Sequence, residues 1–278
     1  PFPRDAMTPV FEQAADSILK LSGVKRGYCL VLGSRTGRLA YELAKRSELM
    51  IYGVDSDPAR VIAAREALLA AGLYGTRVTV DHWPAGRLPY ADYFANLIVS
   101  EETLTTGALP TSQADIMRHL KPCGGVLCLG QGGKPTVTRA ALAGCISGDA
   151  TGKPVVSDKG GLWATWTRGT LPGAGQWTHQ YGDPGNTASS TDTALKCPLG
   201  VLWYGEPGPN KVPSRHLGNA APLTINGRVY LQGINRIMCF DAYNGLPYWE
   251  REVPGAYRVG MVYEASNIAC DDQSLFVV

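Results

Sequence analysis

The residues best suited to chemistry fall in three turns, each of which follows a short apolar run. The first turn, residues 33–37 (Gly-Ser-Arg-Thr-Gly), has two glycines that let the backbone approach a ligand, which the amides of a new helix would face. The second contains Asp55, whose carboxylate can accept hydrogen bonds from both hydroxyls of a ribose. The third contains Asp81, His82 and Trp83, which suit the polar edge and the flat face of adenine. The residues that this pattern selects for a nucleoside site are Gly33, Ser34, Gly37, Asp55, Asp81 and His82.

The elements that must position these turns alternate between strand and helix. Apolar runs predict strands at Tyr28–Leu32, Leu49–Val54, Arg77–Val80, Ala95–Val99 and Val126–Leu129. Helical spacing of apolar residues predicts helices at Thr8–Leu21, Thr36–Arg46, Pro58–Ala71, Thr111–His119 and Thr136–Ala143. This alternation is typical of an α/β fold with a mostly parallel, doubly wound sheet, and Pro154–Ser157 and Leu162–Thr167 would close its edge as an antiparallel hairpin. Ligands of such sheets bind beyond the carboxyl ends of the strands, where all three turns lie.

The same residues carry a family resemblance. Residues 29–46 (CLVLGSRTGRLAYELAKR), 52–58 (YGVDSDP), 87–99 (RLPYADYFANLIV) and 119–126 (HLKPCGGV) resemble the class I S-adenosylmethionine-dependent methyltransferases in order and spacing. The resemblance implies a Rossmann-like, seven-stranded domain at residues 1–170. It also implies that Gly33 and Gly37 lie against the methionine part of S-adenosylmethionine, with Asp55 on the ribose and Asp81 near the adenine.

The sequence also departs from the pattern of that family. The family's acidic residue two positions before the first glycine is Val31 here, and its middle glycine is Arg35. A cationic side chain at this place is expected to oppose a sulfonium cofactor, so we expect weak or absent binding, with S-adenosylhomocysteine favoured. Glu101 and Glu102 follow the fourth strand, where they are either a base, a metal ligand or solvated loop carboxylates. The catalytic residues and the methyl acceptor stay unassigned.

The chain changes character after the segment 169–175, which is rich in Gly and Pro and is expected to be a linker. Short β segments follow at Val201–Tyr204, Ala221–Ile225, Arg228–Leu231, Arg236–Phe240 and Tyr248–Val253. Asn226-Gly227, between Ala221–Ile225 and Arg228–Leu231, is a strong hairpin signal, and the segments are predicted to give a four-stranded meander. Residues 267–278 partly repeat residues 221–231, and a period of ~40–50 residues with four strands is typical of a β-propeller blade.

Two motifs make this second region, residues 176–278, resemble the pyrroloquinoline-quinone-type propeller repeat. They are residues 239–249 (CFDAYNGLPYW) and 176–187 (QWTHQYGDPGNT). The resemblance implies that Asp241 and Gly245 shape a hairpin and that Trp249 docks on a neighbouring blade. Because the quinone-binding hallmarks, an adjacent-cysteine disulfide and a calcium cluster, are missing, pyrroloquinoline quinone is not expected as a cofactor.

Composition limits the partners. A formal net charge of +2 gives no electrostatic reason to expect a nucleic acid or an anionic membrane, and no apolar run approaches the ~18 residues of a membrane span. The cysteines are odd in number (7) and lack a C-x-x-C pair, so most are expected to be small buried hydrophobes, as at Cys29 and Cys128. The spacing of the 4 histidines suggests no metal site.

Three functions fit these patterns. The first is a binding or scaffold protein, in which a degenerate S-adenosylmethionine-binding fold is joined to a propeller that contacts a protein partner. The second is an active methyltransferase, and the third is a fragment of a quinoprotein oxidoreductase. About two blades cannot close a ring of four to eight, and the chain opens at Pro1 without Met, so we expect a longer protein with further blades.

Overall fold

The computed structural model describes residues 2–84, 86–145, 152–212, 221–256 and 268–277. The chain divides into two compact units, Pro1–Gly169 and Thr170–Val278. Each unit has a hydrophobic core of its own. The division falls at the start of the segment rich in Gly and Pro.

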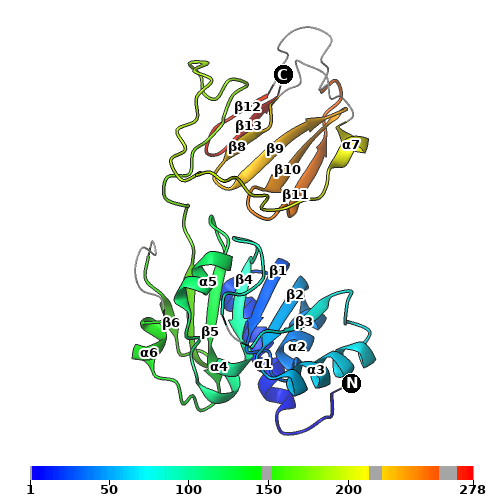
Figure 1. Ribbon diagram of the computed structural model, residues 1–278, viewed down its shortest axis with the longest axis vertical. Coiled ribbons are helices and arrows are strands. Elements are labelled where there is room, and N and C mark those ends of the chain that lie inside the picture. The colour runs from blue at the N-terminus through cyan, green and yellow to red at the C-terminus, as the bar shows by residue number, and fades with distance from the viewer. Residues whose placement is uncertain (1, 85, 146–151, 213–220, 257–267, 278) are drawn as a thin grey trace. The chain divides into compact units, whose positions relative to one another are not determined.

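The first unit is built on a seven-stranded sheet with the order β3-β2-β1-β4-β5-β7-β6 (Figure 1). Its strands are β1 (Arg26–Leu32), β2 (Glu48–Asp55), β3 (Val78–His82), β4 (Leu97–Ser100), β5 (Val126–Gly132), β6 (Val155–Ser157) and β7 (Gly161–Thr167). Neighbours among β1 to β5 pair in parallel, whereas β7 pairs antiparallel with both β5 and β6. The predicted Rossmann-like, mostly parallel sheet with a closing hairpin is therefore confirmed.

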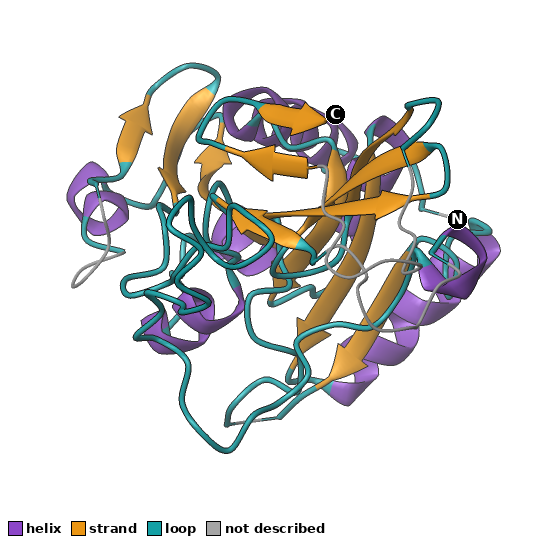
Figure 2. Cartoon of the chain, turned by 90° about the horizontal axis from the view of Figure 1, so that it is seen from above, coloured by secondary structure: helices purple, strands orange, loops and turns teal. Residues whose placement is uncertain are grey.

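Helices cover both faces of this sheet, as Figures 1 and 2 show from two directions. The helices of the first unit are α1 (Thr8–Ser22), α2 (Arg38–Arg46), α3 (Pro58–Ala70), α4 (Glu101–Thr106), α5 (Gln113–His119) and α6 (Arg139–Ala143). Side chains of α1, α2 and α3 pack into one buried cluster, and those of α5 and α6 pack into the cluster on the other face. This layering buries the apolar stripe of each helix, which is what stabilises helices of this length.

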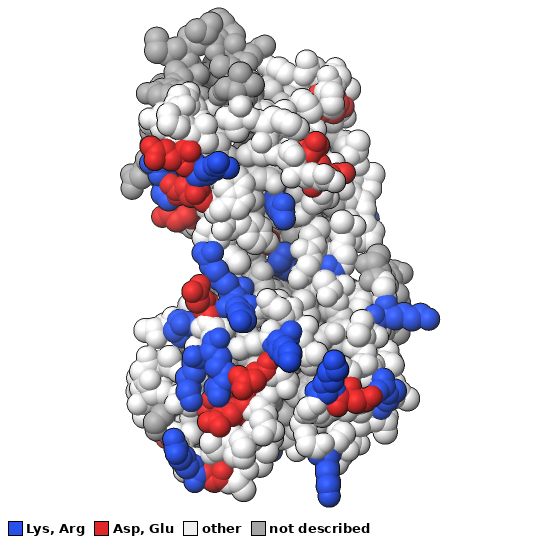
Figure 3. Space-filling view, turned by 180° about the vertical axis from the view of Figure 1, so that it is seen from behind, with Lys and Arg blue, Asp and Glu red and all other residues white. Residues whose placement is uncertain are grey.

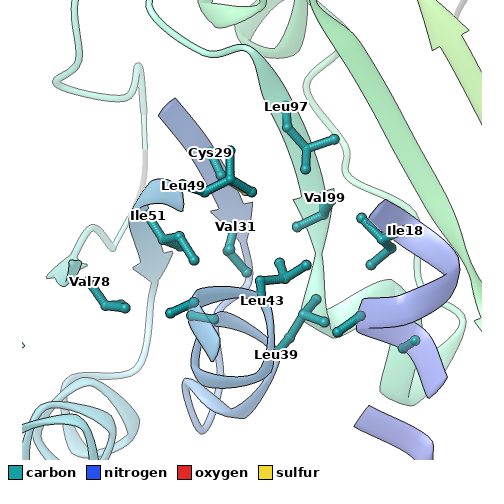
Figure 4. Close-up of a cluster of buried hydrophobic side chains, with 14 of the residues drawn as sticks. Ile18, Cys29, Val31, Leu39, Leu43, Leu49, Ile51, Val78, Leu97 and Val99 are labelled. Atoms are coloured by element: carbon teal, nitrogen blue, oxygen red, sulfur yellow. The ribbon is translucent and has the colours of Figure 1, made fainter. Parts of the chain in front are cut away.

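The first buried cluster fixes the position of α2, the helix that begins at the glycine turn. Leu39 and Leu43 of α2 point towards Val31 of β1 and Val99 of β4 (Figure 4), and all four are fully buried. Burying a Leu or Val side chain contributes roughly 1.5–3 kcal/mol, so these contacts hold the start of α2 against the ends of the strands.

Helix α4 was not expected from the sequence, which predicts a loop after the fourth strand. Ser100 caps this helix, since its hydroxyl accepts a hydrogen bond from the backbone N–H of Thr103 at 3.0 Å. Two acidic residues occupy the first turn, where they favour the positive end of the helix. Half of the six residues are threonine, which has low helix propensity, and this hides the helix in the sequence.

The second unit contains a four-stranded antiparallel sheet with the order β11-β10-β9-β8. Its elements are α7 (Gly208–Lys211), β8 (Leu223–Ile225), β9 (Arg228–Gly233), β10 (Arg236–Asp241), β11 (Pro247–Glu252), and the hairpin of β12 (Ile268–Cys270) with β13 (Leu275–Val277). Asn226 and Gly227 both have positive φ (51° and 72°), as the predicted hairpin turn requires. The predicted four-stranded meander is thus confirmed.

The expected strand at Val201–Tyr204 is wrong. These residues are irregular, and Trp203 instead donates its indole N–H to the carbonyl of Ala242 at 3.0 Å. Its ring lies on Gly245, where a Cβ would come within 2.4 Å of it. This apolar run therefore anchors a loop through one aromatic side chain rather than through strand pairing.

The turn after β10 is organised by Asp241, as the propeller resemblance implies. Its buried carboxylate accepts hydrogen bonds from the backbone N–H groups of Tyr243 (2.9 Å) and Asn244 (3.2 Å). Trp249 is 42% exposed and contacts Tyr230, with ring centroids 6.0 Å apart. One sheet and one hairpin occur in many all-β folds, so the start of a propeller at residues 176–278 stays a prediction.

Charged side chains of both signs lie beside one another on the face of the first unit that Figure 3 shows. Among the described residues, no helix is long and apolar enough to span a membrane.

Candidate functional site

The glycine turn links β1 to α2 at the carboxyl edge of the sheet. Gly33, Arg35 and Gly37 all have positive φ (54°, 43° and 74°). Between them, Ser34 is fully buried, and its backbone N–H donates to the carbonyl of Val54 at the end of β2 (2.8 Å). The turn is therefore attached to β2 as well as to the two elements that it connects.

Asp55 lies at the end of β2 and holds the same turn. Its carboxylate accepts the backbone N–H of Arg35 at 2.7 Å on one oxygen and that of Asp57 at 2.9 Å on the other. The residue is 4% exposed, and Arg60 approaches it to 3.8 Å. Each carboxylate oxygen has two lone pairs, so both oxygens keep one for a ligand hydroxyl.

The third predicted turn lies next to the second, because β3 pairs with β2. His82 is opposite Asp55 in the register, and its Nε2 lies 3.2 Å from the carbonyl of Ser56. Asp81 accepts a hydrogen bond from the hydroxyl of Tyr90 at 2.8 Å. Burial, followed by this carboxylate, raises the pKa of Tyr90 and keeps it a proton donor. The structure thus brings together all three strand ends that the sequence selects.

Glu101 is fully buried at the first position of α4. Its Oε1 accepts hydrogen bonds from the backbone N–H (3.1 Å) and the hydroxyl (2.7 Å) of Thr36, and its Oε2 accepts the N–H of Leu39 (3.0 Å). Burial raises the pKa of Glu101 to about 7, although the hydrogen bonds from Thr36 and Leu39 oppose the rise. A solvated loop carboxylate is therefore the wrong interpretation of this residue.

Glu102 lies beside Gly33 and pairs with Arg35. A Cβ at position 33 would come within 2.7 Å of the Cβ of Glu102, so only glycine allows this approach. The Oε1 of Glu102 is 3.5 Å from Nη1 of Arg35, and its side chain is 45% exposed. The positive charge at Arg35 thus has a carboxylate partner at the turn.

A cavity of about 310 Å³ opens at this edge of the sheet. It is lined by Leu32, Gly33, Trp83, Gly86, Leu88, Ser100, Glu102, residues 108–112, Asp115 and Ile116. The indole N–H of Trp83 is buried in the protein without an acceptor. This donor is left without a partner in the protein interior, where unpaired donors are costly.

Gly37 serves helix packing, because a Cβ there would lie 3.1 Å from the Cβ of Ala64 and 3.2 Å from Cδ1 of Leu68 on α3. We expect Gly37→Ala to lower the free energy of unfolding by roughly 1–2 kcal/mol for the left-handed backbone and by about 1–3 kcal/mol more for overpacking. Gly72→Ala is the matched control, because Gly72 has a similar φ of 70° and open space around it. Urea unfolding of both variants measures the difference, and equal losses would contradict the packing role of Gly37.

One protein family matches this part of the chain. The family model described as "Methyltransferase domain" matches residues 29–124, which include the glycine turn, Asp55, Asp81 and both glutamates after β4. Residues 29–124 thus match a methyltransferase domain. S-adenosylmethionine is the cofactor that this family implies.

Two solved structures resemble the unit that contains the methyltransferase domain. One is a protein of Methanococcus maripaludis assigned as an S-adenosyl-L-methionine-dependent methyltransferase, with 22% identity, a TM-score of 0.48, and coverage of 59% of this chain and 88% of that one. The other is a methyltransferase of Aquifex aeolicus, with 20% identity, a TM-score of 0.46, and coverage of 59% and 93%. A comparison with curated proteins finds no match.

Within the methyltransferase domain, the cavity contains only part of what the sequence selects. Of the six predicted site residues, Gly33 lines it, whereas the lining does not include Ser34, Gly37, Asp55, Asp81 and His82. Sequence reasoning missed the cavity wall at residues 108–116, whose one signal is its place after the fourth strand. In the described part of the chain, no group of three or more His, Cys, Asp or Glu side chains is arranged to hold a metal ion.

Proposed function

We propose that the first unit binds S-adenosylmethionine at the carboxyl ends of β1, β2 and β3 and methylates a small acceptor in the adjoining cavity. The observation that carries this proposal is the cavity itself, which is lined by both the glycine turn and the start of α4. When bound, the cofactor supplies an electrophilic methyl group on a sulfonium. The residues of this chain must bind it, orient it and exclude water.

The nucleoside half of the cofactor is assigned to Asp55, Asp81 and His82. Asp55 keeps a free lone pair on each oxygen for the ribose hydroxyls, and its two backbone hydrogen bonds fix the carboxylate in place. Asp81 can accept from the amino group of adenine, with its second oxygen 3.7 Å from Arg65. Trp83 lines the cavity and offers an aromatic ring to the adenine.

The methionine half is assigned to the turn, with Gly33 and Ser34 as its backbone and Glu102 as the nearest carboxylate. Glu102 offsets the charge of Arg35 and is exposed enough to accept the cofactor's ammonium group. Gly37 supports the turn by letting α2 pack closely on α3. Val31 and Arg35 are the two departures from the family pattern that favour a degenerate scaffold in the sequence. Glu102 compensates for both, since it provides a carboxylate at the turn and pairs with Arg35. The geometry therefore supports the active methyltransferase better than the scaffold.

The acceptor is assigned to the part of the cavity formed by residues 108–116. Apolar side chains of Leu88, Leu109 and Ile116 line it together with the hydroxyl-bearing residues Thr111 and Ser112. The wall offers polar and apolar surface in similar amounts, so it suits a small organic molecule that carries polar groups.

Calorimetric titration of the whole chain with S-adenosylmethionine and S-adenosylhomocysteine tests the proposal. We expect both to bind, with Kd on the order of 10 μM or below, because the pairing of Arg35 with Glu102 removes most of the repulsion of the sulfonium. No heat of binding for either compound, in a sample shown to be folded by circular dichroism, would overturn the methyltransferase proposal and restore the scaffold.

A further inference from the structure

We propose that Glu101 is a positioning residue. Its ionised carboxylate holds the glycine turn in the conformation that binds the cofactor, and the turn leaves that conformation when Glu101 is protonated. This inference rests on the proposed cofactor site. Glu101 accepts hydrogen bonds from Thr36 in the turn and from Leu39 in α2, and it does not line the cavity. It therefore acts through these two residues rather than on the cofactor.

The first step of the argument is the hydrogen-bond inventory. Helix α2 has Gly37 at its N-cap, and no side-chain cap satisfies its first N–H groups locally. From α4, Glu101 accepts one of these N–H groups, that of Leu39, on one oxygen, and its other oxygen binds Thr36 in the turn. All three donors point at a fully buried carboxylate, and the bond from Leu39 is itself buried, so water does not take it over.

The second step is what a proton does to this arrangement. An ionised carboxylate is an acceptor at both oxygens, whereas a protonated one carries a hydroxyl donor on one of them. That donor would face either the N–H of Leu39 or the donors of Thr36, and the protonated oxygen is a weaker acceptor, so the bonds on that side of the turn weaken. Burial places this change near neutral pH, because it raises the pKa of Glu101 to about 7.

The surrounding charges do not offer another group at this position. Arg35 is the charged residue that acts on Glu101, whose pKa it lowers, while Arg38 and Glu102 are next to Leu39 and Glu101 in the sequence. Arg35 is paired with Glu102, Arg38 is paired with Asp5, and Asp55 is bonded to the backbone of Arg35. His82, at the end of β3, is the histidine of the predicted site, and it serves as a control.

Stability and affinity should change in opposite directions with pH. Burial raises the folded-state pKa of Glu101 above its ordinary 4.5, so the folded chain binds this proton more tightly than the unfolded chain. Its contribution to stability is therefore fully present below about pH 4.5 and is lost as pH rises through about 7. Cofactor affinity should instead fall as pH drops through about 7, because the binding conformation needs the ionised form.

The test is calorimetric titration with S-adenosylhomocysteine between pH 6 and pH 8, on the unaltered chain and on Glu101→Gln. We expect the Kd of the unaltered chain to rise about tenfold from pH 8 to pH 6, with proton release on binding at pH 6.5 seen as a dependence on buffer ionisation heat. Glu101→Gln should bind weakly at every pH without that slope. The ligand's own titration is common to both proteins and cancels in the comparison.

Two further variants serve as controls and keep the test informative if Glu101→Gln does not fold. Thr36→Val removes only the hydroxyl donor at an exposed residue, so it should fold and shift the inflection to higher pH, since that bond lowers the pKa of Glu101. His82→Asn should keep the slope. A slope that persists in Glu101→Gln, or that vanishes in His82→Asn alone, overturns the role of Glu101. If Glu101→Gln does not fold, an unshifted inflection in Thr36→Val overturns it. Tight, pH-independent binding overturns this inference but not the methyltransferase, and no binding at any pH overturns both.

Discussion

Asp55→Ala is expected to weaken binding of S-adenosylhomocysteine by about tenfold to a hundredfold. A hydrogen bond to a charged group contributes about 1.5–3 kcal/mol, and the ribose would lose its carboxylate. The same change leaves the N–H groups of Arg35 and Asp57 without their acceptor, so the turn itself loosens. Calorimetric titration gives the affinity, and urea unfolding gives the accompanying loss of stability.

Asp57→Ala is the matched control for this variant. Asp57 lies two residues further along and accepts the N–H of Ala59 at 2.9 Å as the N-cap of α3. Its loss should cost about 1 kcal/mol of stability. The Kd for S-adenosylhomocysteine should stay within about twofold of that of the unaltered chain, which is a few tenths of a kcal/mol in binding free energy. Equal affinity losses in the two variants would mean that Asp55 acts only through general loosening of the segment 55–58.

The second large effect is expected at the ion pair of Arg35 and Glu102. Glu102→Gln leaves the Arg35 charge without its partner at 3.5 Å, so S-adenosylmethionine should bind about tenfold more weakly. S-adenosylhomocysteine lacks the sulfonium charge, so it should lose less. Arg35→Gly should act in the opposite direction, since it removes the cation and relieves a left-handed backbone at φ 43°.

A double-mutant cycle separates these contributions. If Arg35 affects the cofactor through Glu102, the change in affinity caused by Glu102→Gln should shrink in the Arg35→Gly background. The ratio of the two Kd values, for S-adenosylmethionine and for S-adenosylhomocysteine, is the measured quantity. Identical ratios in all four proteins would show that neither side chain faces the sulfonium.

The architecture of the first unit could be predicted because local patterns decide it. Parallel strands buried on both faces read as apolar runs, and each helix between them has its own apolar stripe. The hairpin at Asn226-Gly227 was equally readable, since its backbone needs positive φ. Local patterns misled at Val201–Tyr204, where one aromatic contact replaces pairing, and at α4, where threonines mask a helix that Ser100 caps.

The candidate site was predictable only in part, for a related reason. The topology rule places Gly33, Asp55 and Asp81 at one edge without any knowledge of side-chain contacts. It does not say that Glu102 reaches Arg35 or that Glu101 binds Thr36, because these contacts depend on β4 pairing with β1. The sequence therefore suggests that Arg35 repels a sulfonium cofactor, whereas the fold provides Arg35 with a carboxylate partner, Glu102.

The bond from Thr36 to Glu101 joins residues 65 positions apart, whereas that from Arg35 to Asp55 spans 20. The entropy cost of closing the loop between two such residues must be met before their contact stabilises the chain. The turn can therefore acquire its final shape only once β4 lies beside β1. A nascent chain that ends before Glu101 would have the whole sequence motif of the turn and still lack the three hydrogen bonds that Glu101 accepts.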